Sequence, residues 1–363
     1  MKGESLVLIK QNDEIYYVSL KELYEMKDSL SSIQILDREG GNFNWVSIER
    51  ISQIDNQKKT RFIKANVGYS QIVQEDFPIL TQSGLVPAAE VREEDMVNTV
   101  DSAFIFNLTK GNKAANRVKN KFTKSNIGFE LTNELGWFTG IFLSDGGINS
   151  GSIDIIQNPE PQFEKLLAIC KKYSINYTIG SGKAGKTFTT KTNPFTQWLK
   201  ANFKEGYGEK KLPKEFIYYP TEFLDGLIAG MIDGDGGVEG YKSQYGIIRT
   251  SSEQLCRQLS FYLSSYVTDC FDKVPYNGNI DEFSTQKRPI YSFGFILTNT
   301  DYFSKIGSVK IDAVNREGHN VIFNNYNWVN IKENEDFIGN CSTLYEIKTE
   351  SGHFLCNGIL TNC

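Results

Sequence analysis

An internal repeat constrains the fold of the middle of this chain. Residues 135–147, LGWFTGIFLSDGG, are matched 90 residues later by residues 225–237, DGLIAGMIDGDGG. Small residues recur every four positions in each copy, and both copies close with Asp-Gly-Gly. Positions four apart share one face of a helix, so each copy predicts a helix with one face nearly free of side chains. Two such helices can pack backbone against backbone, closer than helices usually approach.

This packing would bring Asp145 and Asp235, at the C-terminal ends of the two predicted helices, side by side. Neighbouring carboxylates repel each other unless something neutralises them, and a divalent metal ion is the usual partner. Because the donors are hard oxygens with no soft ligand nearby, Mg2+ is the expected ion. A glycine-spaced apolar helix can also serve for tight packing alone. Two copies in register, each with the same aspartate motif, favour a metal site.

The repeat resembles the signature of the LAGLIDADG homing endonucleases. Residues 228–236, IAGMIDGDG, are close to that signature letter by letter, and the first copy keeps its glycines and its final Asp-Gly. The resemblance implies a site-specific endonuclease that cuts both strands of a long, asymmetric DNA site. It also implies Asp145 and Asp235 as catalytic metal ligands, with Mg2+ as the cofactor and Mn2+ as a substitute.

The same family places a lysine near each active site. Lys210, in the run KKLP, matches the family position ahead of the second helix, and Lys310 is the expected counterpart in the second repeat. Lys305 is the alternative to Lys310, and a surface lysine can also be merely solvated. Asp233 and Glu239 adjoin the expected site and are expected to be structural.

Predicted helices and strands alternate in two similar rounds over about residues 128–322. The first round has predicted helices and strands at 133–144, 152–156, 160–173, 175–191 and 193–203. The second has them at 222–234, 246–250, 252–266, 270–298 and 300–306. This order predicts an α/β (α+β) domain of two pseudo-symmetric αββαββα repeats, about 128–208 and 209–322.

Segments rich in short strands bracket this duplicated middle. Residues 1–105 contain predicted strands at 5–10, 14–19, 33–36, 45–48, 71–74 and 77–81, and residues 340–363 contain others at 344–348, 353–356 and 359–360. Short strands at such spacing favour an all-β unit. The two ends are therefore expected to form one β domain split across the termini, joined to the middle by a basic segment at 106–127.

The tail resembles the C-terminal splicing blocks of inteins over about 20 residues, including NGILTNC at 357–363. The side-chain amide of Asn362 can attack its own main-chain carbonyl and break the next peptide bond, and the thiol of Cys363 can receive the upstream segment. His353 can polarise or protonate a group in this step. The resemblance implies a Hint-type splicing domain that carries the endonuclease as an insert and acts on flanking host segments in cis.

Four positions depart from the intein pattern. Met1 falls one place after the expected first nucleophile, so that nucleophile is missing from the sequence as written. Gln74 and Phe77 stand where inteins have Thr and His, and phenylalanine cannot transfer a proton. Thr361 replaces the penultimate histidine. Cleavage at the C-terminal junction is thus expected, whereas complete splicing is not.

Charge is unevenly distributed along a chain whose net charge is −5. Residues 110–214 hold 17 Lys and Arg against 8 Asp and Glu. A basic surface on an acidic protein favours a polyanionic partner, although a lysine-rich linker can also be simply solvated. The expected contacts to double-stranded DNA are Lys110, Lys113, Arg117, Lys119, Lys121, Lys124, Lys183, Lys186, Lys191 and Arg249. The strands at 152–191 and 246–298 would lie in the major groove.

The resemblance to inteins and homing endonucleases implies an intracellular protein of a microbe or phage, cytoplasmic and beside the nucleoid. The six cysteines form no CxxC pair, which fits a reducing compartment. No apolar run is long enough for a membrane span, and the first residues lack the apolar core of a signal peptide. A monomer is expected, because both repeats lie in one chain.

Two alternatives stay open from the sequence. Met1 and Phe77 fit a free-standing endonuclease whose splicing domain has decayed. A DNA-binding protein of the same fold that does not cut is the other, and the presence of both aspartates and of Lys210 argues against it.

Overall fold

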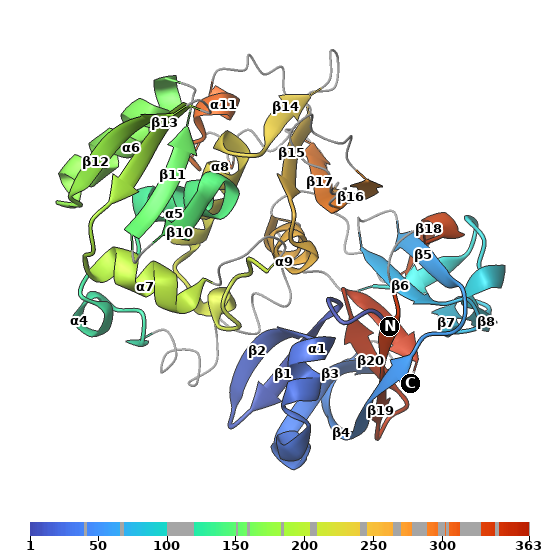
Figure 1. The fold of residues 1–363 in the computed structure, drawn as a ribbon. Coiled ribbons are helices and arrows are strands. Elements are labelled where there is room, and N and C mark those ends of the chain that lie inside the picture. Colours follow the sequence, from blue (N-terminus) through green and yellow to red (C-terminus); the bar gives the residue numbers. More distant parts are fainter. Residues whose placement is uncertain are drawn as a thin grey trace.

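The structure, a computed structural model, describes most of the chain. The described residues are 1–39, 42–65, 69–99, 120–149, 152–157, 160–182, 185–203, 209–239, 245–263, 270–277, 289–296, 302, 305–312, 328–337 and 341–362. In Figure 1 the strands of both chain ends lie together, close to the N and C labels, and the helices and strands of the middle form a second part beside them. We call these the terminal part and the central part.

Two antiparallel sheets make up the terminal part. Its strands are β1 (Leu6–Gln11), β2 (Glu14–Ser19), β3 (Ile33–Glu39), β4 (Asn42–Asp55), β5 (Thr60–Ala65), β6 (Ser70–Gln74), β7 (Pro78–Thr81), β8 (Gly84–Pro87), β9 (Met96–Asn98), β18 (Trp328–Asp336), β19 (Thr343–Thr349), β20 (His353–Cys356) and β21 (Ile359–Asn362). The sheet orders are β19-β4-β3-β1-β20-β21, with β2 on β1, and β6-β5-β18-β9-β7-β8. The other elements are α1 (Leu20–Glu25) and 3₁₀ helices at Lys27–Ser32 and Ala88–Glu90. Both sheets thus combine strands from the two ends of the sequence.

The first hairpin forms where the sequence predicts it. Strands β1 and β2 pair with Gln11 opposite Glu14. The two turn residues, Asn12 and Asp13, have φ angles of 52° and 63°. Positive φ at both central positions gives a turn whose twist matches that of the strands, and Asn and Asp tolerate this conformation better than most residues.

Strands β5 and β18 were not expected from the sequence. They pair with each other in the second sheet, and β18 lies in the stretch between the predicted middle and the predicted tail. Their sequences are rich in charged residues, and such sequences are typical of loops. Lys64 on β5 and Glu333 on β18 face each other and form an ion pair of 2.9 Å. This pairing lets a buried lysine lie within a sheet.

The two repeat segments form α5 (Asn133–Asp145) and α8 (Thr221–Asp233), which pack backbone against backbone as predicted. A Cβ atom added to Gly140 would lie 2.8 Å from Cα of Gly230, and one added to Gly230 would lie 2.9 Å from Cα of Gly140. Cβ atoms do not approach other atoms so closely. At Gly136 and Gly226 an added Cβ would clash with a carbonyl oxygen of the other helix. Only glycine fits at these four positions.

Two sheets of the central part have the same strand order, β10-β11-β13-β12 and β14-β15-β17-β16. Their strands are β10 (Gly146–Asn149), β11 (Ser152–Gln157), β12 (Tyr177–Gly182), β13 (Gly185–Thr190), β14 (Gly237–Glu239), β15 (Tyr245–Thr250), β16 (Cys270–Asn277) and β17 (Pro289–Ile296). The helices are α4 (Lys124–Ile127), α6 (Glu160–Lys172), α7 (Pro194–Asn202), α9 (Glu253–Leu263), α11 (Val309–Asp312) and a 3₁₀ helix at Phe216–Tyr218. Strands β10 and β14 were missed, and the helix expected at 300–306 lies mostly outside the described residues.

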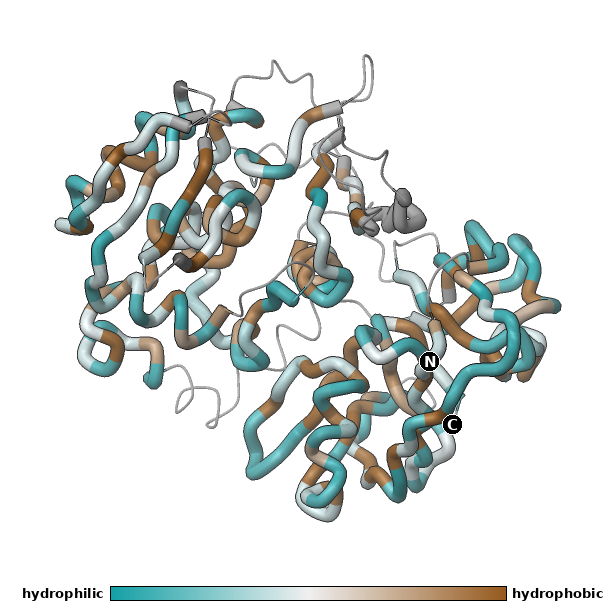
Figure 2. The backbone as a smooth tube through the Cα atoms, in the orientation of Figure 1, coloured by the Kyte–Doolittle hydropathy of each residue, from teal (hydrophilic) through white to brown (hydrophobic). Residues whose placement is uncertain are grey.

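Buried apolar side chains form clusters in both parts, and Figure 2 colours the hydrophobic residues along the backbone brown. Trp137, Phe138 and Phe142 on α5 and Phe223 on α8 are fully buried. Each of these helices is therefore buried on nearly every side, with glycine toward its partner and bulky residues toward the sheets. Over the described residues, the structure contains no helix that is long and apolar enough to cross a membrane.

We predict that Gly230→Ala lowers the free energy of unfolding by about 3 kcal/mol or more, because the added methyl group forces two backbones apart. Gly237→Ala is the matched control, since a Cβ there meets nothing within 4 Å. Urea unfolding, followed by tryptophan fluorescence, measures both. Equal unfolding midpoints for the two variants would contradict the packing described for α5 and α8.

Candidate functional site

The ends of α5 and α8 bring the two candidate carboxylates to one place. Asp145 is the last residue of α5, and Asp235 follows the end of α8 by two residues. A Cβ added to Gly234 would lie 3.0 Å from Oδ2 of Asp145. Asp145 thus lies against the residue that immediately precedes Asp235. The convergence depends on the helix packing, because both aspartates sit at the helix ends.

Lys210 and Lys310 bind the carbonyl groups at these two helix ends. The Nζ atom of Lys210 donates to the carbonyl oxygens of Leu143 and Gly146, each at 2.9 Å, with longer contacts to neighbouring carbonyls. The last carbonyls of a helix lack intrahelical donors and carry partial negative charge, so an ammonium group suits them. Lys210 therefore stabilises the end of α5.

Lys310 does the same at α8. Its Nζ atom donates to the carbonyl oxygens of Gly234 and Gly236, both at 2.8 Å. The two lysines thus occupy equivalent places at the two helix ends, and each lies close enough to feel the charges of both aspartates. Lys305, the alternative candidate, is exposed and donates its main-chain N–H to the carbonyl of Tyr302.

Electrostatics couples these four residues. Burial lowers the pKa of Lys210, and the charges of Asp235 and Asp145 oppose this effect. Burial also lowers the pKa of Lys310. The side chain of Asp235 reaches solvent, yet the surrounding protein removes enough water to raise its pKa. The cations of Lys210, Lys310 and Arg249 act in the opposite direction on Asp235.

Asp233 has a structural role, as expected from the sequence. It is buried, and its carboxylate accepts hydrogen bonds from Nε1 of Trp137 at 2.7 Å and Oγ of Ser308 at 2.7 Å. It also accepts from the main-chain N–H groups of Val309 and Lys310. Asp233 therefore fixes the start of α11 and with it the position of Lys310. Its partners lie 75 or more residues away, so no local sequence pattern indicates which groups it binds.

The donor set suits a hard divalent cation. The described residues contain no group of three or more His, Cys, Asp or Glu side chains placed to hold a metal ion. Asp145 and Asp235 offer carboxylate oxygens alone. Mg2+ commonly binds through one or two carboxylates and completes its shell with water and substrate phosphates. Two adjacent aspartates therefore fit this ion.

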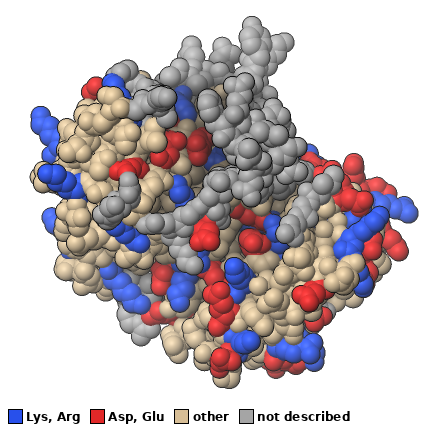
Figure 3. Space-filling model, in the orientation of Figure 1, with Lys and Arg blue, Asp and Glu red and all other residues tan. Residues whose placement is uncertain are grey.

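The expected DNA contacts are only partly described. Lys110, Lys113, Arg117, Lys119 and Lys183 lie outside the described residues. Lys121 forms an ion pair of 3.6 Å with Glu14 of the terminal part, and Nζ of Lys186 lies over the ring of Phe163. Lys124 begins α4, and Lys191 follows β13. Figure 3 shows acidic and basic side chains side by side over the face it draws.

The C-terminal candidates lie on one hairpin. His353, on β20, is the register partner of Asn362, on β21. Cys363 lies outside the described residues. The hydroxyl of Thr361 is buried and accepts a hydrogen bond of 2.6 Å from Nε2 of Gln71. Gln71, on β6, was not predicted from the sequence, because it matches none of the motifs considered there.

The N-terminal segment lies beside this hairpin. Met1 is buried, and its α-amino group donates to the carbonyl of Tyr345 at 2.9 Å. Burial lowers the pKa of this amino group to about 6. Gln74 is the last residue of β6, and its side-chain Nε2 donates a hydrogen bond to Oδ1 of Asn56. Phe77 packs against the apolar cluster that contains Met1.

Both curated proteins and solved structures include proteins that are similar to this chain. No family model matches the chain. Similar curated proteins include the DNA-directed RNA polymerase subunit Rpo1C of Methanocaldococcus jannaschii, 25% identical over 54% of this chain and 24% of its own length. The DNA polymerase of Thermococcus litoralis is 23% identical over 66% of this chain and 15% of its own length. This chain thus spans about a quarter or less of these relatives.

Similar solved structures include an intein from a hyperthermophile, with 22% identity and a TM-score of 0.26 over 28% of this chain and 73% of that one. The homing endonuclease I-DmoI with its target DNA and Mg matches with 11% identity and a TM-score of 0.34, over 51% and 98%. The N-terminal LAGLIDADG domain of DUF199/WhiA matches with 11% identity and a TM-score of 0.32, over 56% and 93%. The two families that the sequence resembles, inteins and LAGLIDADG proteins, are both among the solved structures similar to this chain.

Proposed function

We propose that this chain is an intein whose Hint-type splicing domain, split across the termini, carries a LAGLIDADG endonuclease. The pairing of β1 with β20 and of β4 with β19 supports a single domain built from residues 1–105 and 340–363. Because β18 pairs with β5 and β9, we extend the C-terminal share of that domain back to residue 328. The equal strand order of the two central sheets supports the paired repeats in 128–322.

The endonuclease function rests on one observation, the position of Asp145 and Asp235 at the packed ends of α5 and α8, with Asp145 against Gly234. We propose that these carboxylates hold Mg2+, or Mn2+ in its place. The bound ion would activate water and offset charge on the phosphate. The protein's own contribution is a rigid frame: the glycine contacts fix the distance between the helix ends, and thus between the carboxylates.

Lys210 and Lys310 are proposed to favour the binding and cleavage of a DNA phosphodiester at this site. Each ammonium group is anchored on helix-end carbonyls and held partly buried, so it needs little reorganisation when a substrate arrives. A fixed positive charge beside the scissile phosphate would stabilise the charge that builds up during cleavage. The lysines also offset repulsion between the carboxylates and the DNA backbone.

The proposed partner is double-stranded DNA, bound by a monomer at a long asymmetric site. The exposed Ile156 on β11 lies on the sheet face opposite to that of the buried Ile155 and Phe188. Such a sheet face can lie in the major groove and contact base edges. Two unequal repeats in one chain would read two different half-sites, so no palindrome is needed.

The splicing function is proposed to be partial. In the C-terminal step, the side-chain nitrogen of Asn362 attacks the main-chain carbonyl carbon of the same residue. The bond to the nitrogen of Cys363 breaks, leaving a succinimide on Asn362 and a free amine on Cys363. His353, opposite Asn362 in the hairpin register, is proposed to polarise the carbonyl or protonate the leaving amine.

A free-standing endonuclease with a decayed splicing domain is the second candidate. The observation that favours it concerns Gln74 and Phe77, the residues expected to act at the first splice junction. Gln74 is bonded to Asn56, and Phe77 is packed among apolar side chains, so neither takes the proton-transfer role of the usual residues. A non-cutting DNA-binding protein is a weaker candidate, because it would not need both Asp145 and Asp235 at the packed helix ends. The buried thiols of Cys170, Cys256, Cys341 and Cys356 fit work beside DNA in a reducing cytoplasm.

For the endonuclease, we predict Mg2+-dependent cleavage of both strands of a site selected from a randomised DNA library. Asp145→Asn and Asp235→Asn should each reduce the cleavage rate by at least about 100-fold, because each removes a charged ligand that acts at the reacting phosphate. DNA binding, measured by gel shift in Ca2+, should stay within a few-fold. Asp13→Asn, on an exposed turn, is the matched control. Undiminished cutting by either site variant would reject the assignment.

For the splicing junction, we predict slow release of a reporter segment attached after Cys363, with no ligated product. Asn cyclisation needs only a well-held backbone and a polarised carbonyl, whereas the first acyl shift needs the histidine that Phe77 replaces. The missing penultimate histidine should slow release by about 10²-fold. Asn362→Ala should block release, and Asn44→Ala, at an exposed position of β4, should not. Mass spectrometry of the products distinguishes release from ligation, and a ligated product would contradict the account.

A further inference from the structure

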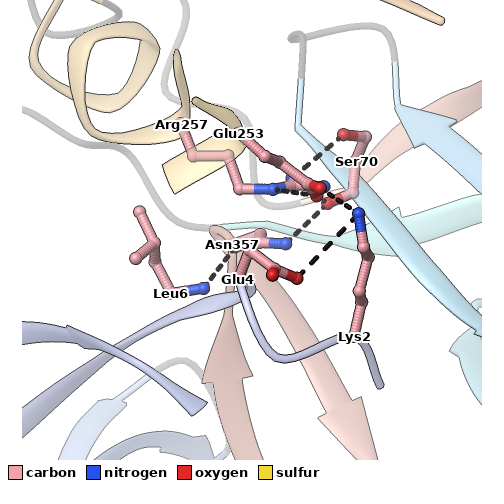
Figure 4. A network of polar contacts seen from close by, with 7 residues as sticks. All are labelled: Lys2, Glu4, Leu6, Ser70, Glu253, Arg257 and Asn357. Atoms are coloured by element: carbon pink, nitrogen blue, oxygen red, sulfur yellow. Dashed lines mark hydrogen bonds and ion pairs between the residues drawn. The ribbon is translucent and has the colours of Figure 1, made fainter. Parts of the chain in front are cut away.

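A buried polar network joins α9 of the central part to the N-terminal segment (Figure 4). The Nζ atom of Lys2 is paired with Oε2 of Glu253, and Oε1 of Glu253 accepts two hydrogen bonds from the guanidinium of Arg257, at 2.9 and 3.1 Å. Lys2 and Glu253 are only 8% and 6% exposed. Desolvation would raise the pKa of Glu253, but the charges of Arg257 and Lys2 outweigh it and hold the pKa below its ordinary value. The three charges therefore stabilise one another.

Arg257 extends this network to β6. Its Nη1 atom donates to the carbonyl oxygen of Ser70 at 3.1 Å and to Oγ of Ser70 at 3.3 Å. The same carbonyl oxygen accepts a hydrogen bond of 2.9 Å from Nδ2 of Asn357. Arg257 and Asn357 thus share one acceptor, as Figure 4 shows. A guanidinium on this carbonyl fixes the place where the side chain of Asn357 binds.

Asn357 lies in the turn of the hairpin that carries Asn362. Its φ angle is 48°, and that of Gly358 is 78°, so the turn needs two residues in the left-handed region. The side chain of Asn357 accepts from the N–H of Leu6 at 2.6 Å, in addition to its bond to Ser70. Both ends of this amide are therefore bonded, which holds the turn in its strained conformation.

The next residue of β6 holds the other end of the same hairpin. Nε2 of Gln71 donates to the carbonyl of Cys356 at 3.1 Å and to the hydroxyl of Thr361 at 2.6 Å. Thr361 directly precedes Asn362. Strand β6 therefore binds the turn through Ser70 and the reactive strand through Gln71. Any shift of β6 moves both strands of this hairpin.

We propose that Arg257, on α9 of the inserted part, is a positioning residue for the reaction at Asn362, acting through Ser70 and the 357–361 hairpin. The proposal rests on the splicing function proposed above. Cyclisation requires the amide nitrogen to approach the carbonyl at a defined distance and angle, and a displacement of about 1 Å can cost roughly 100-fold in rate. The inserted part is thus a structural component of the splice junction as well as a nuclease.

The test measures release of a reporter segment attached after Cys363 in four full-length chains. Arg257→Met keeps the apolar stem and removes all donors, so release should slow by about tenfold or more. Arg257→Lys restores one donor and the charge and should recover part of that rate. Arg61→Met is the matched control, because Arg61 binds Asn334 and Asp336 away from the hairpin. Equal slowing by Arg61→Met and Arg257→Met would overturn the proposal, since the effect would then be general destabilisation.

Two further readouts keep the test decisive. DNA cleavage by Arg257→Met should match that of the unsubstituted chain, which shows that α5 and α8 are still packed. Hydrogen exchange of the main-chain amides at 354–362 should be faster in Arg257→Met, while those of the two helices keep their protection. If the unsubstituted chain releases nothing, the proposed splicing function fails. Hydrogen exchange at 354–362 then remains as the test of whether Arg257 positions the hairpin. Unchanged exchange at 354–362 would then overturn the role of Arg257.

Discussion

The contact between the backbones of α5 and α8 determines the geometry of the central part. With glycine at 136, 140, 226 and 230, the helices meet with no side chain between them. The bulky residues of each helix must then face outward, where the two sheets cover them. The aspartates follow at the helix ends, so their separation is set by main-chain contact. A main-chain contact has no rotamers, which makes it a rigid support for a pair of charged groups.

Electrostatic repulsion in this arrangement is offset by cations at the helix ends. Two helix C-termini and two carboxylates bring partial and full negative charges together, which is unfavourable without cations. Lys210 and Lys310 supply them, each bound to the terminal carbonyls of one helix. The two ends are not identical. Asp233 fixes the segment that bears Lys310, and its equivalent by the 90-residue offset is Leu143, an apolar residue.

How much the sequence predicts depends on the range of the interaction involved. The spacing of the glycines that include Gly140 and Gly230 is enough to indicate a helix face, and Asn12-Asp13 indicates a turn. The sequence therefore predicts both the helix packing and the first hairpin. Strand β18 was not predicted, because its polar residues are compatible with a sheet only through the distant pairing of Lys64 with Glu333. Family resemblance favours position 310 over 305, and the contacts of Asp233 that hold Lys310 in place join residues 76 and 77 positions apart. Gln71 and Arg257 belong to no motif, since only tertiary packing gives them their partners.

The contacts between the two parts of the chain bear on how the proposed splicing domain could decay around the proposed insert. Phe77 lies in the apolar cluster of the terminal part, so its presence leaves the hairpin of Asn357 and Thr361 intact. Loss of Glu253 would act differently, because it would remove the carboxylate that pairs with the buried cations of Lys2 and Arg257. Substitutions at the first junction are therefore compatible with a folded chain, whereas substitutions in the shared network disturb the contact between the two parts. This difference explains how the departures from the intein pattern at 74 and 77 can coexist with a fully bonded C-terminal hairpin.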